Sequence, residues 1–434
     1  MDYKDKIVNM DEVKKLKKKI DQEDDAKLDF HLNDNNKIKA NSLYNIELIL
    51  ENDPELQGLF KYNDFTSEID VVKASDKLLI KPGQLKDAYL DEIDAYIEKS
   101  SEYDHVLFKM PLLRSAVVIV ANHHHYNPVK DYMEQAVKDW DGQHRLDTFF
   151  SDYLGVDQTP ITRLITRLWF IGAVVKVFEP TAKFDFVLDL VGGQGAGKTT
   201  TLQKLAPKGY YTDQFADFES KDSFAVMRRA LIVNDDEMTA TANSSFETLK
   251  KFVTLQEFEY RKPYGHEAER FPKGFVIART TNNLYYLKDK TGERRFLPLL
   301  VNRAQQKANP VRDLTSHYVE QCWGEAMHVY KSGEYDFTLT SEQEAKLDKY
   351  RESFMYTDVL EDTIADCMEN EWKDRDFLSN DDISLKIAPG VSLTKNRRLS
   401  NKIMNIMVNQ FGWVKGQKKI NGENHRGYVK KVTH

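Results

Sequence analysis

The sequence predicts an α/β protein: a central domain built on a sheet, preceded by a small, mainly helical N-terminal domain and followed by a C-terminal module of helices and a hairpin. Three observations lead to this prediction. Apolar residues recur at helical spacing in the first 130 residues, strand-like and helix-like stretches alternate between residues 184 and 300, and the basic segment from residue 389 ends in two strand-like runs. The domain boundaries are expected at 1–130, 131–335 and 340–434, with a polar linker near residues 332–342.

The composition excludes several classes of protein. The 434 residues are 41% hydrophobic and 30% charged, which is ordinary for a soluble folded chain. No run of about 18 apolar residues is present, so no membrane span is expected, and residues 1–11 lack the apolar segment of a secretory signal. Cys322 and Cys367 are too far apart in sequence to suggest a zinc site or a disulfide framework, which favours a cytoplasmic location. The net charge of −7 argues mildly against indiscriminate coating of nucleic acid.

Two helices are expected early in the N-terminal domain. The first begins at Asn41 or Ser42, either of which can cap it, and stops at the turn signal of residues 52–54. The second carries Leu85, Tyr89, Ile93 and Tyr96 at a spacing of about four residues. Residues 101–140 are also expected to be helical. They include three adjacent histidines, which do not suggest a metal site because neighbours on a helix point about 100° apart. The charge-dense stretch 11–27 is interpreted as a solvated helix rather than a partner-binding tail, and the role of this domain is not predicted.

A glycine-rich loop is the strongest chemical signal in the chain. It follows the strand-like stretch 184–191 and precedes the helix-like TTLQKLA, and it reads G-x-x-x-x-G-K-T. Glycines let backbone N–H groups turn inward around phosphate oxygens, and the following helix adds the partial positive charge of its amino end. The pattern therefore predicts a P-loop that binds ATP with Mg²⁺, in which Lys198 neutralises the outer phosphates and Thr199 offers its hydroxyl to the metal. The expected nucleotide-binding residues are Gly192, Gly193, Gln194, Gly195, Ala196, Gly197, Lys198, Thr199 and Thr200.

Three acidic residues follow the next apolar run, residues 230–234. A strand that ends in acids delivers carboxylates to the sheet edge where phosphates bind. Asp236 and Glu237 are expected to be the Asp-Glu pair of an AAA+ ATPase, one holding the metal through water and the other polarising the attacking water. Asp235 is an alternative metal ligand, because three adjacent acids leave the register open. The predicted metal set is Thr199, Asp235 and Asp236.

Two further catalytic candidates lie downstream. The apolar run 275–279 leads into Thr-Thr-Asn, where Asn282 is expected to hydrogen-bond the attacking water or the γ-phosphate. The segment TGERRF contains Arg294 and Arg295, and an arginine near the γ-phosphate stabilises the charge that spreads in phosphoryl transfer. In ring ATPases that arginine comes from the neighbouring subunit. The sequence does not decide between the two arginines, and a surface ion pair is the alternative interpretation.

These segments together resemble the virulence-associated protein E family, whose ATPase core is similar to superfamily 3 helicases of phages and mobile elements. The resemblance is carried by WDGQHRLDTFFSDYLG, GGQGAGKTT, KKFVTLQEFEYRKPYG, RTTNN, YLKDKTGERRF and the terminal HRGY, and it is clearest from residue 128 to residue 298. One departure concerns Asn234, where family members commonly carry a glutamate. This leaves the division of labour among the three acids open.

The resemblance implies a hexamer with single-stranded DNA in a central pore, acting in the replication of a mobile element. It also implies a hairpin between the acidic strand and the sensor strand that projects basic residues into the pore. Here the matching stretch is 261–270, and its Pro-Tyr-Gly is a turn signal in its own right. Contacts to the phosphate backbone are expected from Lys262 and His266.

The C-terminal module is basic, with Glu423 as the one acid against ten lysines and arginines from residue 389 onward. A helix with Leu399, Ile403 and Met407 on one face is followed by two strand-like runs around Asn-Gly, a strong hairpin signal. Helices followed by a two-stranded wing describe a winged helix, which predicts duplex DNA as a further partner. A basic face docking the acidic stretch upstream is the alternative. The expected DNA contacts are Lys395, Arg397, Arg398, Lys418, Lys419 and Arg426.

The sequence as a whole predicts a magnesium-dependent ATPase that works as a ring-shaped DNA helicase or translocase. The main alternative is a DNA-binding protein that ATP switches between oligomeric states without strand separation. A small-molecule kinase is disfavoured because such an enzyme rarely combines a sensor asparagine, an Arg-Arg pair and a basic DNA module. Polarity, ring size and sequence specificity are not predicted.

Overall fold

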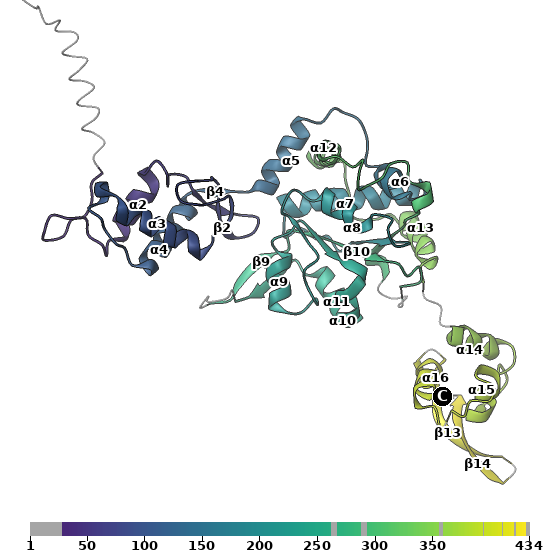
Figure 1. Ribbon diagram of the computed structural model, residues 1–434. Helices are drawn as coiled ribbons and strands as arrows, with labels where there is room; N and C mark the ends of the chain where they lie inside the picture. Colours follow the sequence, from purple (N-terminus) through teal and green to yellow (C-terminus); the bar gives the residue numbers. More distant parts are fainter. Residues whose placement is uncertain are drawn as a thin grey trace, which may run out of the picture.

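A computed structural model describes residues 28–261, 267–287, 293–355, 359–393, 395–409, 411–420 and 422–430. Figure 1 shows three folded parts in chain order, an N-terminal part in purple and blue, a central part built on a sheet, and a C-terminal part in yellow-green. Each has its own hydrophobic core. The predicted DNA contacts Lys262 and His266, and the side chain of Arg398, lie outside the described residues.

The N-terminal part contains the two predicted helices, α2 (Leu43–Asn52) and α3 (Asp87–Lys99), together with α4 (Met110–His123). Ser42 caps α2, because its side chain accepts a hydrogen bond from the backbone of Asn45. A small sheet in the order β3-β2-β1-β4 was not predicted. Its strands are too short to give a period-two signal: β1 (Phe60–Asn63), β2 (Glu68–Val71), β3 (Gly83–Gln84) and β4 (His125–Tyr126).

The segment 101–140, which was predicted to be helical, is largely so but is not one continuous helix. It is divided into the short η1 (Ser101–Tyr103), α4, the strand β4 and α5 (Pro128–Lys138). The run of histidines marks the break, because His123 ends α4 and His125 pairs with Tyr62 in the sheet. Pro128 at the first position of α5 and the capping side chain of Asn127 explain why a new helix starts there.

The central part is a five-stranded parallel sheet in the order β11-β5-β10-β7-β6. Its strands are β5 (Val187–Val191), β6 (Tyr211–Thr212), β7 (Ile232–Asp235), β10 (Val276–Thr281) and β11 (Phe296–Leu300). This agrees with the predicted α/β class. Strand β10 comes late in sequence but lies between β5 and β7, so that the glycine loop and the acidic residues end up on either side of it.

Helices cover both faces of this sheet (Figure 1). Alternate strand residues face opposite cores: Leu188 and Leu190 point into one, and Val187 and Val191 into the other. The first core includes α6 (Phe149–Leu154), α7 (Pro160–Phe178), α8 (Lys198–Leu205) and α12 (Ser316–Ser332). The second includes α9 (Lys221–Met227), α10 (Thr239–Asn243) and α11 (Phe246–Thr254), with the hairpin of β8 (Glu257–Tyr260) and β9 (Glu269–Pro272).

A row of charged side chains crosses the middle of the sheet. Arg279 of β10 is opposite Asp189 of β5 on one side and Asp235 of β7 on the other, and all three are buried. The Arg279 guanidinium donates to the two carboxylate oxygens of Asp189 at 2.7 and 2.6 Å, and the Tyr286 hydroxyl donates to the same carboxylate at 2.5 Å. Charges this deep are stable only when paired, so the row fixes the register of three strands.

The N-terminal part contacts the edge of the central part near β6. Glu68 accepts hydrogen bonds from Arg228 and Arg229, each at 2.7 Å, and the Arg228 guanidinium lies 4.8 Å from the centre of the Phe271 ring in β9. Asn63 donates to the Tyr210 hydroxyl at 3.1 Å. The contact therefore reaches both the sheet edge and the base of the β8–β9 hairpin.

Two lysines of the central part, Lys176 and Lys273, are buried. Burial lowers the pKa of Lys273 to about 7 and that of Lys176 to about 8, although Asp185 opposes the shift in both. Each ammonium group is held by backbone carbonyls, that of Lys273 by Val253 and that of Lys176 by Pro180 and Ala182. Both lysines thus secure the ends of the helices α11 and α7.

Lys273→Met is expected to change how stability depends on pH. The folded-state pKa of Lys273 lies below its unfolded value, so between about pH 7 and pH 10 the unfolded chain binds the additional proton and wild-type stability rises with pH. The destabilisation caused by Lys273→Met should therefore grow by about 2 kcal/mol between pH 7 and pH 9. Urea unfolding of both proteins at several pH values measures this, and a difference that stays constant across the window would contradict it.

The C-terminal part has the order helix, strand, helix, helix, strand, strand. Its helices are α14 (Val359–Glu369), α15 (Asn380–Ile387) and α16 (Arg397–Asn409), and its strands β12 (Phe377–Ser379), β13 (Trp413–Ile420) and β14 (Glu423–Lys430) form an antiparallel sheet in the order β12-β14-β13. The predicted helix and hairpin are confirmed, whereas the short β12 was not predicted. Within the described part of the chain, no helix is both long and apolar enough to cross a membrane.

Candidate nucleotide-binding site

The glycine loop connects β5 to α8 at the carboxyl edge of the sheet. Gly195 and Gly197 adopt the left-handed backbone conformation, with φ of 76° and 85°. A side chain would not fit at two positions: a Cβ on Gly192 would lie 2.4 Å from the carbonyl oxygen of Val301, and one on Gly197 would lie 2.4 Å from Pro310. The tight packing of the loop against residues 301–310 explains why these positions need glycine.

Lys198 begins α8 and turns back over this loop. Its ammonium group donates to the carbonyl oxygens of Gly192 at 2.6 Å and Gly193 at 3.2 Å, and to Oδ1 of Asn282 at 2.8 Å. Burial lowers its pKa, while Glu237 and Asp236 oppose that change. The cation therefore lies at the centre of the loop, where a bound phosphate would need it.

Asp236 is the carboxylate that meets the glycine loop. Its Oδ1 accepts hydrogen bonds from the hydroxyls of Thr199 and Thr280, each at 2.7 Å, and lies 3.3 Å from the amide of Asn234. Thr199 and Asp236 are thus brought together as predicted, and their oxygens are of the type that Mg²⁺ prefers.

Asp235, also in the predicted metal set, forms its hydrogen bonds away from Thr199. Its carboxylate accepts hydrogen bonds from the backbone N–H groups of Ala240 and Thr241 at 2.8 and 2.9 Å, and from the Thr241 hydroxyl at 2.5 Å. Adjacent residues at a strand end point to opposite faces of the sheet, so Asp235 faces α10 and the buried row while Asp236 faces the loop. Burial raises the pKa of Asp235. Of the predicted metal set, the structure brings Thr199 and Asp236 into direct contact, whereas Asp235 forms its hydrogen bonds with α10.

Asn282 joins the lysine to the glutamate. While its Oδ1 accepts from Lys198, its Nδ2 donates to the two carboxylate oxygens of Glu237 at 3.1 and 3.2 Å. Glu237 and Met238 have φ of 51° and 52°, a conformation that is unfavourable for residues other than glycine and is concentrated at functional sites. Asp236 and Glu237 also line a hollow of about 290 Å³, together with Asp213 and Phe215.

Three residues near the loop were not predicted from the sequence. Thr280 accepts a hydrogen bond from the backbone N–H of Glu237 at 2.9 Å in addition to donating to Asp236. The amide of Gln306 donates to the carbonyl of Ala196 at 2.7 Å, and a guanidinium nitrogen of Arg303 is 3.5 Å from where a Cβ on Gly195 would lie. Arg303 and Gln306 follow β11, and only the pairing of β11 with β5 places them beside the loop.

Thr280→Val is expected to lower kcat for ATP hydrolysis about tenfold while preserving the fold. The change removes the donor to Asp236 and the acceptor of the backbone N–H of Glu237, and each such hydrogen bond contributes about 0.5–1.5 kcal/mol. Steady-state ATPase assays measure the effect. Thr280→Ser retains the hydroxyl and should keep most of the activity, and equal loss in both variants would argue against this role.

Arg294 and Arg295 are far from the glycine loop of their own chain. They lie in η3 (Glu293–Arg295) just before β11, whose Phe296 pairs with Val187 and whose Leu300 pairs with Val191. They are therefore at the amino edge of the sheet, whereas the loop leaves its carboxyl edge.

The predicted DNA contacts are placed in part. The β8–β9 strands pair from Glu257↔Pro272 to Tyr260↔Glu269, so the expected hairpin exists up to its undescribed tip. In the C-terminal part, Lys418 and Lys419 of β13 and Arg426 of β14 are exposed on the predicted wing. Lys395 and Arg397 are exposed at the start of α16.

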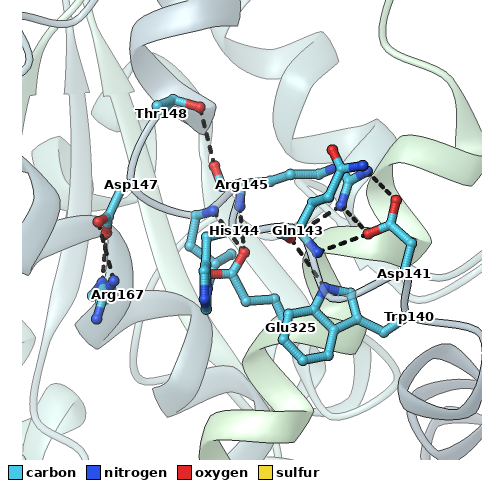
Figure 2. A network of polar contacts seen from close by, with 10 residues as sticks. Trp140, Asp141, Gln143, His144, Arg145, Asp147, Thr148, Arg167 and Glu325 are labelled. Atoms are coloured by element: carbon cyan, nitrogen blue, oxygen red, sulfur yellow. Dashed lines mark hydrogen bonds and ion pairs between the residues drawn. The ribbon is translucent and has the colours of Figure 1, made fainter.

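A polar network holds the segment that leads into α6 (Figure 2). The buried Glu325 of α12 accepts hydrogen bonds from the backbone N–H groups of Arg145 and Leu146 at 2.5 and 3.0 Å. Arg145 donates to both carboxylate oxygens of Asp141 at 2.7 and 2.6 Å, which lowers the pKa of that carboxyl. Farther along, Asp152 and Leu154 of α6 accept bonds from the backbone after β11, beside the glycine loop. The network is thus part of the scaffold behind the site.

Comparison with known proteins identifies the family. Residues 133–356, more than half of the chain, match the virulence-associated protein E-like domain. The chain belongs to this family. The matched segment of this family member begins within α5 and runs through the glycine loop, the acidic strand and η3 to the end of α13 (Ser341–Glu352).

Other comparisons are more distant. Two structures of the NrS-1 C-terminal region, both without ligand, align over 86% of this chain and 96% of theirs, with TM-scores of 0.43 and 0.40 and identities of 11% and 13%. A likeness of this degree supports no inference about activity. The comparison with curated proteins finds no match.

Proposed function

We propose that this chain is an ATP-dependent DNA helicase or translocase of a phage or mobile element, which acts as a ring on single-stranded DNA in replication. One observation carries the proposal: Lys198, Thr199, Asp236, Glu237 and Asn282 meet at one edge of the parallel sheet, joined by hydrogen bonds of 2.7–3.2 Å. That set contains a phosphate-binding cation, a metal-holding pair, a base and a sensor, which are the groups that one subunit supplies for hydrolysis of a nucleoside triphosphate. The order of the strands supports an AAA+ assignment, because a sensor strand lies between the P-loop strand and the acidic strand.

The site fits Mg-ATP, since side chains are excluded from the loop at Gly192 and Gly197 and a buried cation occupies its centre. When bound, Mg-ATP supplies the phosphoanhydride bond that is cleaved. Lys198 exchanges the carbonyl oxygens of its own loop for phosphate oxygens. Thr199 and Asp236 would hold the metal. Glu237 accepts a proton from the attacking water, and Asn282 orients that water.

The DNA partner is proposed from charge and shape. The β8–β9 hairpin lies between the acidic strand and the sensor strand in sequence, and the proposed pore contacts are Lys262 and His266, which come between β8 and β9 in sequence. The C-terminal part has the element order of a winged helix, with Lys395 and Arg397 at the start of α16 and three basic residues on the wing. We propose that it binds duplex DNA through the phosphate backbone, and that the ring is a hexamer.

Purified protein is expected to hydrolyse ATP only with magnesium, faster with single-stranded DNA, and to separate a forked duplex. Electron microscopy with a non-hydrolysable ATP analogue and single-stranded DNA should reveal closed rings with DNA in the channel. DNA binding and ATPase activity without strand separation would instead favour the ATP-switched DNA-binding protein. Protein that neither binds nor hydrolyses ATP would reject both.

A further inference from the structure

A cluster of cations lies at the amino edge of the sheet. Lys250, Lys251, Arg294 and Arg295 line one surface hollow of about 500 Å³, and the remaining lining residues are Thr254 and Glu247. The side chain of Lys250 is mostly buried and pairs with Glu247 at 2.6 Å, whereas Lys251 and Arg294 are exposed. Four positive charges around one carboxylate leave the hollow with excess positive charge and make it a site for an anion.

The backbone under the two arginines is held rigidly. The guanidinium of the buried Arg351 donates to the carbonyl of Phe296 at 2.8 Å and to that of Arg294 at 2.6 Å, on either side of Arg295. The Nε group of Arg295 is buried and has no hydrogen-bond partner among the described residues. A fixed backbone under the two arginines is what positions their charges for an external anion.

The anion cannot be the nucleotide of the same chain. The in-register parallel pairing of β5 and β11 separates Arg295 from the glycine loop by the full length of a five-residue strand. At about 3.3 Å per residue this is roughly 16 Å, more than an arginine side chain spans. A phosphate that reaches this hollow must therefore arrive on another molecule.

We propose that Lys251 acts together with Arg294 and Arg295 as one anion-binding face, which takes the outer phosphates of ATP held on the glycine loop of a second copy of this chain. The inference rests on the proposed function and adds to it a lysine of α11. In a head-to-tail ring every subunit presents its hollow to the glycine loop of the next subunit. Each subunit therefore supplies a cationic face to one neighbour and receives one from the other. Lys251 then contributes a point charge beside the two arginines, where negative charge builds up during phosphoryl transfer.

The test uses the full chain and mixed subunits. Lys251→Ala is expected to lower kcat for ATP hydrolysis roughly tenfold or more, with unchanged affinity for a fluorescent ATP analogue under conditions that keep the protein monomeric. Lys349→Ala, an exposed lysine of α13 outside the hollow, should hydrolyse ATP at the wild-type rate. Lys251→Arg keeps the charge and should retain most of the activity.

Mixing Lys251→Ala with Lys198→Ala subunits tests whether Lys251 acts on ATP bound to a neighbouring subunit. Each variant alone is inactive or slow, but a Lys251→Ala subunit keeps its own glycine loop and can receive an intact face from a Lys198→Ala neighbour. An equal mixture should therefore recover up to roughly a quarter of the wild-type rate, since half of the loops are intact and half of these have an intact neighbour. Loss of activity in Lys251→Ala without recovery would overturn the inference, as would a wild-type rate for Lys251→Ala. Wild-type protein without any ATPase activity would instead reject the proposed function.

Discussion

Lys198→Ala is expected to abolish ATP hydrolysis, with a fall in kcat/KM of at least about 100-fold. The ammonium group is the one cation at the centre of the loop in the described site, held there by two carbonyls and by Asn282. Alanine removes the charge that would balance the outer phosphates and leaves the transition state without its main local counter-charge. A coupled assay of ADP release with magnesium and single-stranded DNA measures the loss.

The matched control is Lys208→Ala, which removes an exposed lysine from the loop that follows α8. It changes the net charge by the same amount and should leave kcat and KM unaltered. Circular dichroism should be identical for both variants and the wild type. Normal hydrolysis by Lys198→Ala would show that the glycine loop is not the catalytic phosphate site.

Arg279→Leu is expected to be among the most destabilising single substitutions in the central part. It leaves Asp189 fully buried with the Tyr286 hydroxyl as its remaining side-chain donor, and it also removes the positive charge beside Asp235. Breaking a buried pair by removing one partner costs about 3–5 kcal/mol. For a domain of this size that corresponds to a fall of roughly 10 °C in Tm, which differential scanning fluorimetry can measure.

The double variant Asp189→Leu, Arg279→Leu provides the internal check. Removal of both charges avoids an isolated buried ion, so the double variant should be more stable than the sum of the single effects predicts. The exposed Arg312, which is 3.8 Å from Asp313, is the surface control, and Arg312→Leu should change Tm by no more than about 1 °C. If the stability losses of the two single variants simply added up in the double variant, the ion pair between Asp189 and Arg279 would not be stabilising the sheet.

The sequence was most informative where a local motif carries its own geometry. The glycine loop could be recognised without knowledge of any residue distant in the sequence, and the predicted strand and helix on either side of it are present as β5 and α8. The same holds for Ser42 as the cap of α2 and for α16 with its hairpin. Each of these depends on residues close together in the chain.

Features that depend on strand order could not be predicted. Nothing in the local sequence places β10 between β5 and β7, and that placement is what brings Thr280 against Asp236 and Arg279 against Asp189. The division of roles between Asp235 and Asp236 stayed open for the same reason, because it depends on which face of β7 each residue occupies. Arg303 was missed because it approaches the glycine loop only through the pairing of β11 with β5.

The side-chain amide of Asn282 hydrogen-bonds both Lys198 and Glu237, and this has a consequence for the proposed reaction. Asn282 can keep both partners only while the lysine stays on the carbonyls of its own loop. When a phosphate attracts the Lys198 ammonium group, the hydrogen bond from Lys198 to Asn282 is lost. Asn282 then holds the Glu237 carboxylate less firmly. Under the proposed function, phosphate binding at Lys198 and the freeing of Glu237 are therefore expected to be coupled through Asn282.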